Sequence, residues 1–85
     1  MELPEYVCHK RVRAAKITGI FIDSQAHLGG AKLHFEGGVD SVIVPEVYML
    51  KHAPTIGGYF VQYEDGYQSF SPGYSFEVGY TKVDA

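Results

Sequence analysis

The polar residues with the most useful spacing for chemistry lie near the N-terminus, in the segment from Cys8 to Lys16 (CHKRVRAAK). Arg11 and Arg13 are two residues apart, so in an extended strand their guanidinium groups project on one face, roughly 7 Å apart. Guanidinium groups arranged in this way suit the recognition of phosphate or carboxylate groups. The simpler alternative is a strand edge that its charges keep soluble and unpaired.

Aromatic residues form the second group with chemical potential. The chain contains seven tyrosines, five phenylalanines and no tryptophan. A domain of this size cannot fully enclose so many rings, so we expect some of them to face a ligand or a partner, as tyrosine often does at interfaces. Tyr59, Tyr63 and Tyr67 are the candidates for stacking on a nucleotide base beside the two arginines.

Acidic residues are concentrated in the second part of the chain. Residues 1–35 carry five basic and three acidic residues, whereas residues 36–85 carry two basic and seven acidic residues. An isoelectric point near 5.7 argues against a protein that wraps duplex nucleic acid. The alternative candidate interface is therefore an acidic surface made by Glu36, Asp40, Glu46, Glu64 and Asp65.

Catalytic and metal-binding patterns are weak throughout the chain. Cys8 is the single cysteine, which excludes an intramolecular disulfide and a cysteine-rich zinc site, and the adjacent His9 would point to the opposite face of a strand. The four histidines show no metal-ligand spacing. Residues 73–77 (GYSFE) lack the final glycine of a nucleophile elbow. We expect no enzyme activity, no metal and no cofactor.

Length and composition indicate one folded domain. The chain has 85 residues, of which 46% are hydrophobic and 20% charged, a composition typical of globular proteins. A chain this short buries only about 60% of the surface that its unfolded form exposes. We therefore expect a homo-oligomer. No segment is long and apolar enough to span a bilayer, so the expected location is the cytoplasm, with no membrane partner.

The first half of the chain predicts three strands and one helix. Val12–Ile22 is rich in β-branched residues, and Gly19 within it predicts a bulge. Asp23–Gly30 is expected to form a loop, and Ala31–Glu36 alternates apolar and polar residues as a half-buried strand does. Ser41–Val44 predicts a short strand.

The segment Pro45–His52 predicts a short helix. Glu46 lies near its N-terminal end and Lys51 with His52 near its C-terminal end, as the helix dipole prefers. Val47 and Leu50 fall on one face of this helix.

The strongest local signal is a hairpin over Gly58–Ser71, with Asp65 and Gly66 at its turn. A turn of two residues would place Tyr59, Val61, Tyr63 and Phe70 on one face. A loop of three residues with Gly66 as the bulge would shift that register by one. The sequence leaves both registers open.

After the hairpin, Ser71 and Pro72 predict the start of a second helix, because a serine side chain can cap a helix that begins with proline. This helix is expected to run from Pro72 to Val78, to end at a left-handed Gly79 and to be followed by a strand over Tyr80–Val83. The resulting fold class is α+β: a small twisted antiparallel sheet or partly closed barrel with one or two short helices.

The C-terminal third resembles the ending of a family of small proteins from bacteriophages and prophages. The shared elements are residues 65–67 (DGY), 69–72 (SFSP) and 76–80 (FEVGY), and residues 9–10 and 13–17 resemble the opening of the same proteins. Gly73 departs from the pattern, since an ordinary helix former would fit better there. The resemblance implies a phage origin, but the family has no settled activity.

Small phage accessory proteins often act by binding host defence components, and the layout here is similar to that of sponge proteins that oppose Thoeris defence. The resemblance therefore implies a non-catalytic protein in the cytoplasm of the infected host, where an oligomer sequesters a nucleotide-derived immune signal. Arg11 and Arg13 would hold its phosphates and the three tyrosines its base. The alternatives are a protein inhibitor of a host defence complex, which would use the acidic residues, and a virion or replication accessory protein.

Overall fold

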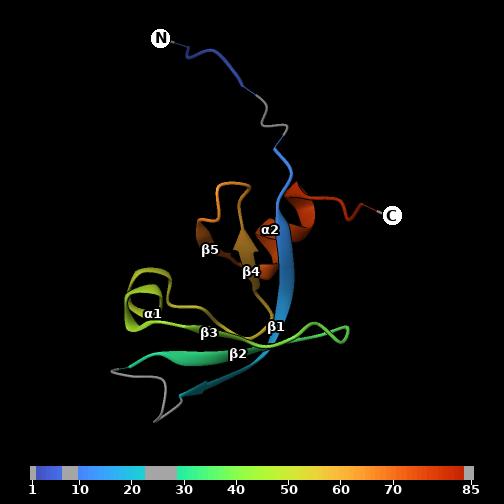
Figure 1. Cartoon of the computed structure of the whole chain (residues 1–85). Coiled ribbons are helices and arrows are strands. Elements are labelled where there is room, and N and C mark those ends of the chain that lie inside the picture. The colour runs from blue at the N-terminus through green and yellow to red at the C-terminus, as the bar shows by residue number, and fades with distance from the viewer. Residues whose placement is uncertain (1, 7–9, 23–28, 84–85) are drawn as a thin grey trace.

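In the computed structural model, which describes residues 2–6, 10–22 and 29–83, five strands form one antiparallel sheet and two short helices pack around it (Figure 1). The strand order in the sheet is β3-β2-β1-β4-β5. The elements are β1 (Arg13–Ile22), β2 (Ala31–Phe35), β3 (Val42–Val44), α1 (Glu46–His52), β4 (Tyr59–Gln62), β5 (Gln68–Ser71) and α2 (Gly73–Gly79).

The long strand β1 joins the two halves of the sheet. Its N-terminal part pairs with β4, and its C-terminal part pairs with β2. The register with β2 shifts between Ile17 and Gly19, which confirms the predicted bulge. A Cβ atom at Gly19 would lie 2.7 Å from the ring of Phe21, so a larger residue would displace that ring. Because a bulge bends its strand, the sheet curls into a half-barrel, as the predicted fold class allows.

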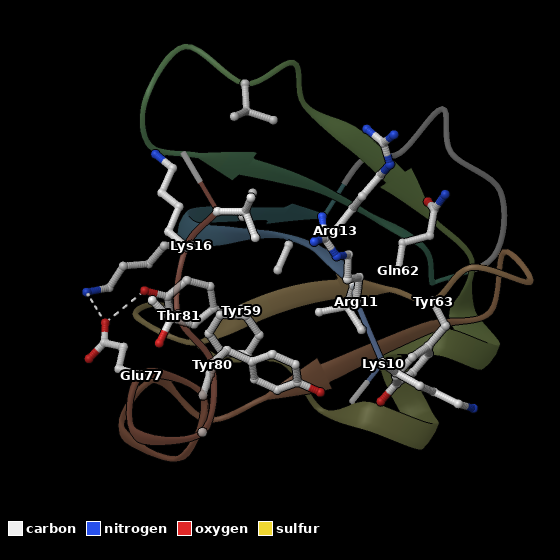
Figure 2. Close-up of a pocket in the computed structure, with 18 of the residues that line it drawn as sticks. Lys10, Arg11, Arg13, Lys16, Tyr59, Gln62, Tyr63, Glu77, Tyr80 and Thr81 are labelled. Carbon is white, nitrogen blue, oxygen red and sulfur yellow. Dashed lines mark hydrogen bonds and ion pairs between the residues drawn. The ribbon is translucent and has the colours of Figure 1, made fainter. Parts of the chain in front are cut away.

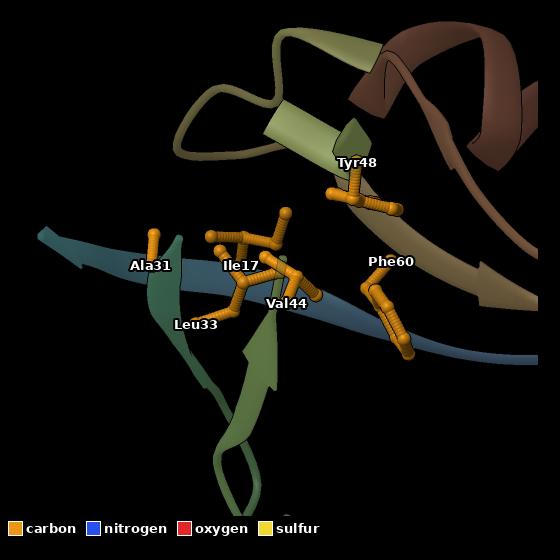
Figure 3. Close-up of a cluster of buried hydrophobic side chains, with 6 residues drawn as sticks. All are labelled: Ile17, Ala31, Leu33, Val44, Tyr48 and Phe60. Atoms are coloured by element: carbon orange, nitrogen blue, oxygen red, sulfur yellow. The ribbon is translucent and has the colours of Figure 1, made fainter. Parts of the chain in front are cut away.

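The hydrophobic core lies inside the curl of the sheet and is closed by α1 (Figure 3). The Tyr48 ring packs 5.8 Å from that of Phe60, and its hydroxyl donates a 2.7 Å hydrogen bond to the carbonyl oxygen of Ser69. This single side chain therefore ties α1 to both β4 and β5. The buried side chains of the core are Ile17, Ala31, Leu33, Val44, Tyr48 and Phe60.

Helix α1 forms where the sequence predicts it, with Glu46 in its first turn and Lys51 with His52 in its last. Val47 and Leu50 do share a face, but that face points to solvent: the two residues are 67% and 76% exposed. Tyr48 occupies the inward face instead, because its long ring reaches the sheet across the open side of the half-barrel.

The β4–β5 hairpin has the three-residue loop. The Tyr63 N–H donates to the Tyr67 carbonyl oxygen (2.9 Å), so these two residues close the hairpin around Glu64, Asp65 and Gly66. Gly66 adopts a φ of 89°, which suits a glycine bulge. The two-residue alternative is therefore wrong: Phe70 lies opposite Phe60, not beside Tyr59 and Tyr63.

Helix α2 exists, but both of its predicted caps are wrong. Ser71 pairs with Tyr59 as the last residue of β5, so the N-cap position falls to Pro72 and carries no side-chain hydrogen bond. At the other end the C-cap is Tyr80 in an extended conformation. The glycine at position 79 thus supplies no left-handed cap, and residues 80–83 form no strand.

Tertiary packing explains the glycine that begins α2. A Cβ atom at Gly73 would collide with the carbonyl oxygen of Gly57, in the loop before β4. The position therefore requires glycine for close approach of two backbones, although glycine disfavours a helix. Neither helix among the described residues is long and apolar enough to cross a membrane.

Candidate functional site

A broad groove runs along the N-terminal half of β1, and we call it the β1 groove (Figure 2). The turn between β2 and β3, with Glu36 and Val39, borders it on one side, and the C-terminal end of α2 with residues 80–83 borders it on another. Its volume of about 1630 Å³ exceeds the roughly 300–1,000 Å³ of ordinary small-molecule sites. The β1 groove is thus an open surface, suited in size to an extended partner.

The groove is positively charged in a protein whose net charge is −3. Five basic and three acidic side chains line it. Among the described residues, Lys16 and Glu77 form the single ion pair. The other four basic side chains of the groove therefore have no described carboxylate within 4.0 Å. The basic side chains that line the groove are Lys10, Arg11, Arg13, Lys16 and Lys82.

Glu77 connects α2 to the sheet at one end of the groove. Its Oε2 accepts a 2.8 Å hydrogen bond from the Tyr59 hydroxyl and lies 3.3 Å from the Lys16 Nζ. The hydrogen bonds from Tyr59 and Lys16 lower the pKa of the Glu77 carboxyl. The same carboxylate raises the pKa of both Lys16 and Tyr59, chiefly through its hydrogen bond to each of them.

Three aromatic rings stack beside this carboxylate. The Tyr59 ring lies 4.2 Å from that of Phe76, and the Phe76 ring lies 4.5 Å from that of Tyr80, with interplanar angles of 22° and 16°. Figure 2 shows Tyr59 and Tyr80, the outer two rings of this stack. The Tyr59 ring is thus already stacked on a ring of α2 within the protein. This stack holds α2 against the sheet.

Four of the five predicted residues, Arg11, Arg13, Tyr59 and Tyr63, line one groove, but Arg13 and Tyr59 point to different faces of the sheet. Arg13 lies directly opposite Gln62, whereas Lys16 lies opposite Tyr59. Side chains alternate along a strand, so Arg13 and Gln62 project on one face and Lys16 and Tyr59 on the other. Figure 2 shows the guanidinium groups of Arg11 and Arg13 extending away from the stacked rings.

Tyr63 and Tyr67 form a separate aromatic pair at the hairpin tip. Their rings are 5.9 Å apart with an interplanar angle of 21°, and the Lys51 Nζ lies 5.0 Å from the centre of the Tyr67 ring. The Asp65 carboxylate accepts a 2.9 Å hydrogen bond from the Tyr67 N–H. Tyr63 lines the β1 groove, but Tyr67 lines only a smaller hollow beside it.

The five acidic residues of the alternative interface lie on several elements of the fold, and some of them share a surface with basic residues. Glu36 and Glu64 line the basic β1 groove. Asp40 lies beyond the turn after β2, and Glu46 begins α1 beside Gly29. Asp65 occupies the hairpin tip, where its carboxylate is used by the turn itself.

Sequence reasoning assigned no role in the site to three residues at this end of the groove, Phe76, Glu77 and Tyr80, and it named Lys16 only as the last residue of the basic segment. The spacing of Phe76 and Tyr80, four residues apart on a helix, was the available signal for a stacked pair. The predictions for Cys8, His9 and His27 lie outside the described residues. In the part of the chain that is described, no three histidine, cysteine, aspartate or glutamate side chains are grouped closely enough to hold a metal ion.

Comparison with known proteins gives one informative likeness. No protein-family model and no curated protein matches the chain, so the motif-level resemblance to small phage proteins, and the layout similarity to Thoeris sponge proteins, stay predictions. The structure is similar to the NMR solution structure of the monomeric form of the phage L decoration protein, with a TM-score of 0.64 and 23% sequence identity.

The likeness covers 88% of this chain and 54% of the phage L protein. The chain thus spans about half the length of that protein. At this level of identity the likeness shows a shared fold.

Proposed function

We propose that this chain is an accessory protein of a bacteriophage virion, which binds the outer surface of the particle in the role of a decoration protein. The observation that carries this proposal is the fold shared with the phage L decoration protein along 88% of the chain. A virion accessory role was one of the alternatives that the sequence left open. The proposed role is non-catalytic and requires no cofactor.

Exposed apolar side chains support a role in binding other proteins. Val47 and Leu50 stand on the outer face of α1, 67% and 76% exposed. Phe21 and Ile43 lie on either side of Lys32 in one row across β1, β2 and β3, and they are 56% and 58% exposed. Large apolar groups in solvent are the kind of surface that a partner covers. The small core makes the same surfaces candidates for contacts in a homo-oligomer.

The test uses particles of the phage that encodes the chain, prepared with and without its gene. The purified protein should sediment with the gene-deleted particles, saturate at a fixed ratio to the major capsid protein and occur at that ratio in wild-type particles. A Val47→Asp, Leu50→Asp double variant is expected to bind less, whereas Glu64→Gln at the hairpin tip serves as the control. Absence from wild-type particles together with no binding to deleted ones would overturn the proposal.

Sequestration of a nucleotide-derived signal is the second candidate, and one observation favours it: basic and aromatic side chains line the same groove. The separation of Arg13 and Tyr59 onto two faces of the sheet weighs against phosphates and a base being held as predicted. Native mass spectrometry with cyclic and ADP-ribose-derived nucleotides tests this role. The protein-inhibitor alternative has less support, because two of its acidic residues, Glu36 and Glu64, line a groove in which basic residues predominate.

A further inference from the structure

The N-terminal half of β1 has a strand neighbour on one side only. Residues Arg13 to Lys16 pair with β4, and pairing with β2 begins at Ile17. Among residues 2–6, 10–22 and 29–83, no strand pairs with the other edge of Arg13–Lys16. Figure 1 shows β4 along one side of this part of β1 and no strand along the other. The sheet therefore has an open edge in its central strand.

The hydrogen bonds at Ile17 define which backbone groups face this edge. The Ile17 N–H donates to the Gly58 carbonyl oxygen (2.8 Å), and the Ile17 carbonyl accepts from the Gly57 N–H (2.9 Å), so Ile17 faces the β4 side. Backbone groups of successive residues point to opposite edges of an antiparallel strand. Ala15 therefore also faces β4.

Ala14 and Lys16 consequently face the open edge. The Lys16 carbonyl confirms this direction, because it accepts a 3.1 Å hydrogen bond from the Glu36 N–H on that side. The N–H of Lys16 and both the N–H and the carbonyl of Ala14 have no backbone partner within the described part of the chain. Three main-chain groups at this edge can thus form hydrogen bonds with another strand.

The open edge of β1 is accessible to another chain. Ala14 is exposed, and residues 12–16 all line the β1 groove. The neighbouring turn contains Gly37 and Gly38, and neither has a side chain or any heavy atom within 4 Å of the position that a Cβ would take. An extended chain therefore meets small residues at the point where it would lie beside β1.

The charges around the edge indicate what kind of chain would lie there. Lys10, Arg11 and Arg13 line the groove, and no described carboxylate lies within 4.0 Å of their nitrogen atoms. Arg11 and Arg13 are spaced as alternate residues of a strand, about 7 Å apart. Carboxylates at alternate positions of an added strand would match this spacing.

We propose that the open edge of β1 at Ala14 and Lys16 binds an extended acidic segment of a partner protein as an additional strand, with its carboxylates on Arg11 and Arg13. Main-chain hydrogen bonds supply affinity in this mode and side chains supply specificity. A second copy of this chain is a poorer fit, because none of the five strands in residues 2–6, 10–22 and 29–83 contains an acidic residue. A nucleic acid lacks the alternating main-chain donors and acceptors that would pair with those of the edge.

A synthetic peptide tests the proposal without any phage particle, so its outcome is independent of the virion role. The probe is a blocked peptide of alternating glutamate and threonine, titrated by calorimetry, with a lysine–threonine peptide as the charge control. We expect the acidic peptide alone to bind, with affinity falling as salt rises. In amide hydrogen exchange, Ala14 and Lys16 should gain protection on binding, whereas Ala15 should not change.

Backbone methylation of the peptide separates strand addition from simple charge attraction. N-methylation at one set of alternate residues should reduce affinity by about tenfold or more, the loss expected for unmade hydrogen bonds, while methylation of the other set should have little effect. In the protein, Ala14→Pro removes the N–H at the open edge and should reduce affinity equally, whereas Ala14→Thr retains it and should bind. Circular dichroism confirms that both variants are folded.

Any one of four results would overturn the proposal. Equal binding of both methylated peptides, or of a thymidine oligonucleotide with the same affinity, would mean that the groove attracts any polyanion. The Ala14 amide could be protected from exchange in concentrated protein without peptide and exposed in dilute protein. Together with a concentration-dependent dimer in ultracentrifugation, this would mean that a second copy occupies the edge. Unchanged affinity in an Arg11→Gln, Arg13→Gln variant would remove the two arginines from the contact.

Discussion

The Tyr59 hydroxyl donates a 2.8 Å hydrogen bond to the Glu77 carboxylate, and the two residues come from β4 and α2, 18 positions apart in the chain. Their contact holds α2 against the face of the sheet that carries Tyr59 and Lys16. Lys16 is the second partner of the carboxylate. The stacked rings of Phe76 and Tyr80 continue the same attachment.

Glu77→Gln should lower the melting temperature at neutral pH, because the hydrogen bonds from Tyr59 and Lys16 favour the charged carboxylate. The pKa of Glu77 is lowered in the folded protein, so its contribution is fully present above the unfolded pKa, about 4.3, and is lost as pH falls through the folded pKa. The difference between wild type and variant should therefore shrink in melts recorded from pH 6 down to about pH 3. A difference that stays constant over this range would contradict the assigned role.

Tyr48→Phe should destabilise the protein by about 1 kcal/mol, because the Ser69 carbonyl loses a 2.7 Å hydrogen bond at a partly buried site. Burial raises the Tyr48 pKa to about 12. This contribution is present below the unfolded pKa near 10 and should be lost as pH rises from there towards about 12. Urea denaturation gives the free energy of unfolding, and spectrophotometric titration should show that the variant lacks a tyrosine with a pKa of about 12.

Gly73→Ala should lower stability even though alanine is favoured in helices by about 1 kcal/mol. The added methyl group would meet the Gly57 carbonyl oxygen, and the backbone there has no side chain that can move aside. Gly79→Ala is the matched control at the other end of α2, since no heavy atom lies within 4 Å of its Cβ position. Thermal melts that place the two variants in the reverse order would show that α2 does not dock against the Gly57 loop.

Gly66→Ala should destabilise the hairpin by roughly 1–2 kcal/mol, the cost of a left-handed conformation for a residue with a side chain. Gly66 has a φ of 89° and donates its N–H to the Tyr63 carbonyl in the three-residue loop. Glu64→Ala, at an exposed position of the same loop, is expected to change stability little. Equal free energies of unfolding for the two variants would argue against this loop.

Leu33→Ala should cost about 2–5 kcal/mol, whereas Leu50→Ala should have a small effect. Leu33 is fully buried in the core, and Leu50 is 76% exposed on α1. If Leu50→Ala proves as costly in urea denaturation at high protein concentration but not at low concentration, Leu50 lies in a contact between subunits. This comparison also tests the expected homo-oligomer.

Local patterns predicted most of the elements. The β-branched residues of Val12–Ile22 predicted β1, and the alternation in Ala31–Glu36 predicted β2. The Asp65–Gly66 pair located the hairpin, and the charges at the ends of Pro45–His52 matched α1. Register was beyond reach, because a two-residue and a three-residue turn fit the same hairpin sequence. Ser71 was misassigned as a cap because its pairing with Tyr59 depends on that register.

The candidate site could be predicted only in part. Arg11, Arg13, Tyr59 and Tyr63 were identified by residue type, and all four line the β1 groove. The placement of Arg13 and Tyr59 on opposite faces of the sheet followed from the pairing of β1 with β4, which local spacing does not encode. The contact between Glu77 and Lys16 could not be predicted from the sequence, because 61 positions separate the two residues.

By itself the sequence determined the α+β class, the bend at Gly19 and the basic character of the segment before and within β1, since each depends on residues near one another in the chain. Only the tertiary structure decided that Val47 and Leu50 face solvent and that Gly73 must be small. It also left the Ala14 edge of β1 open. The reason is that burial, close approach and strand pairing are set by segments distant in sequence, whose mutual position exists only once the sheet has curled around its core.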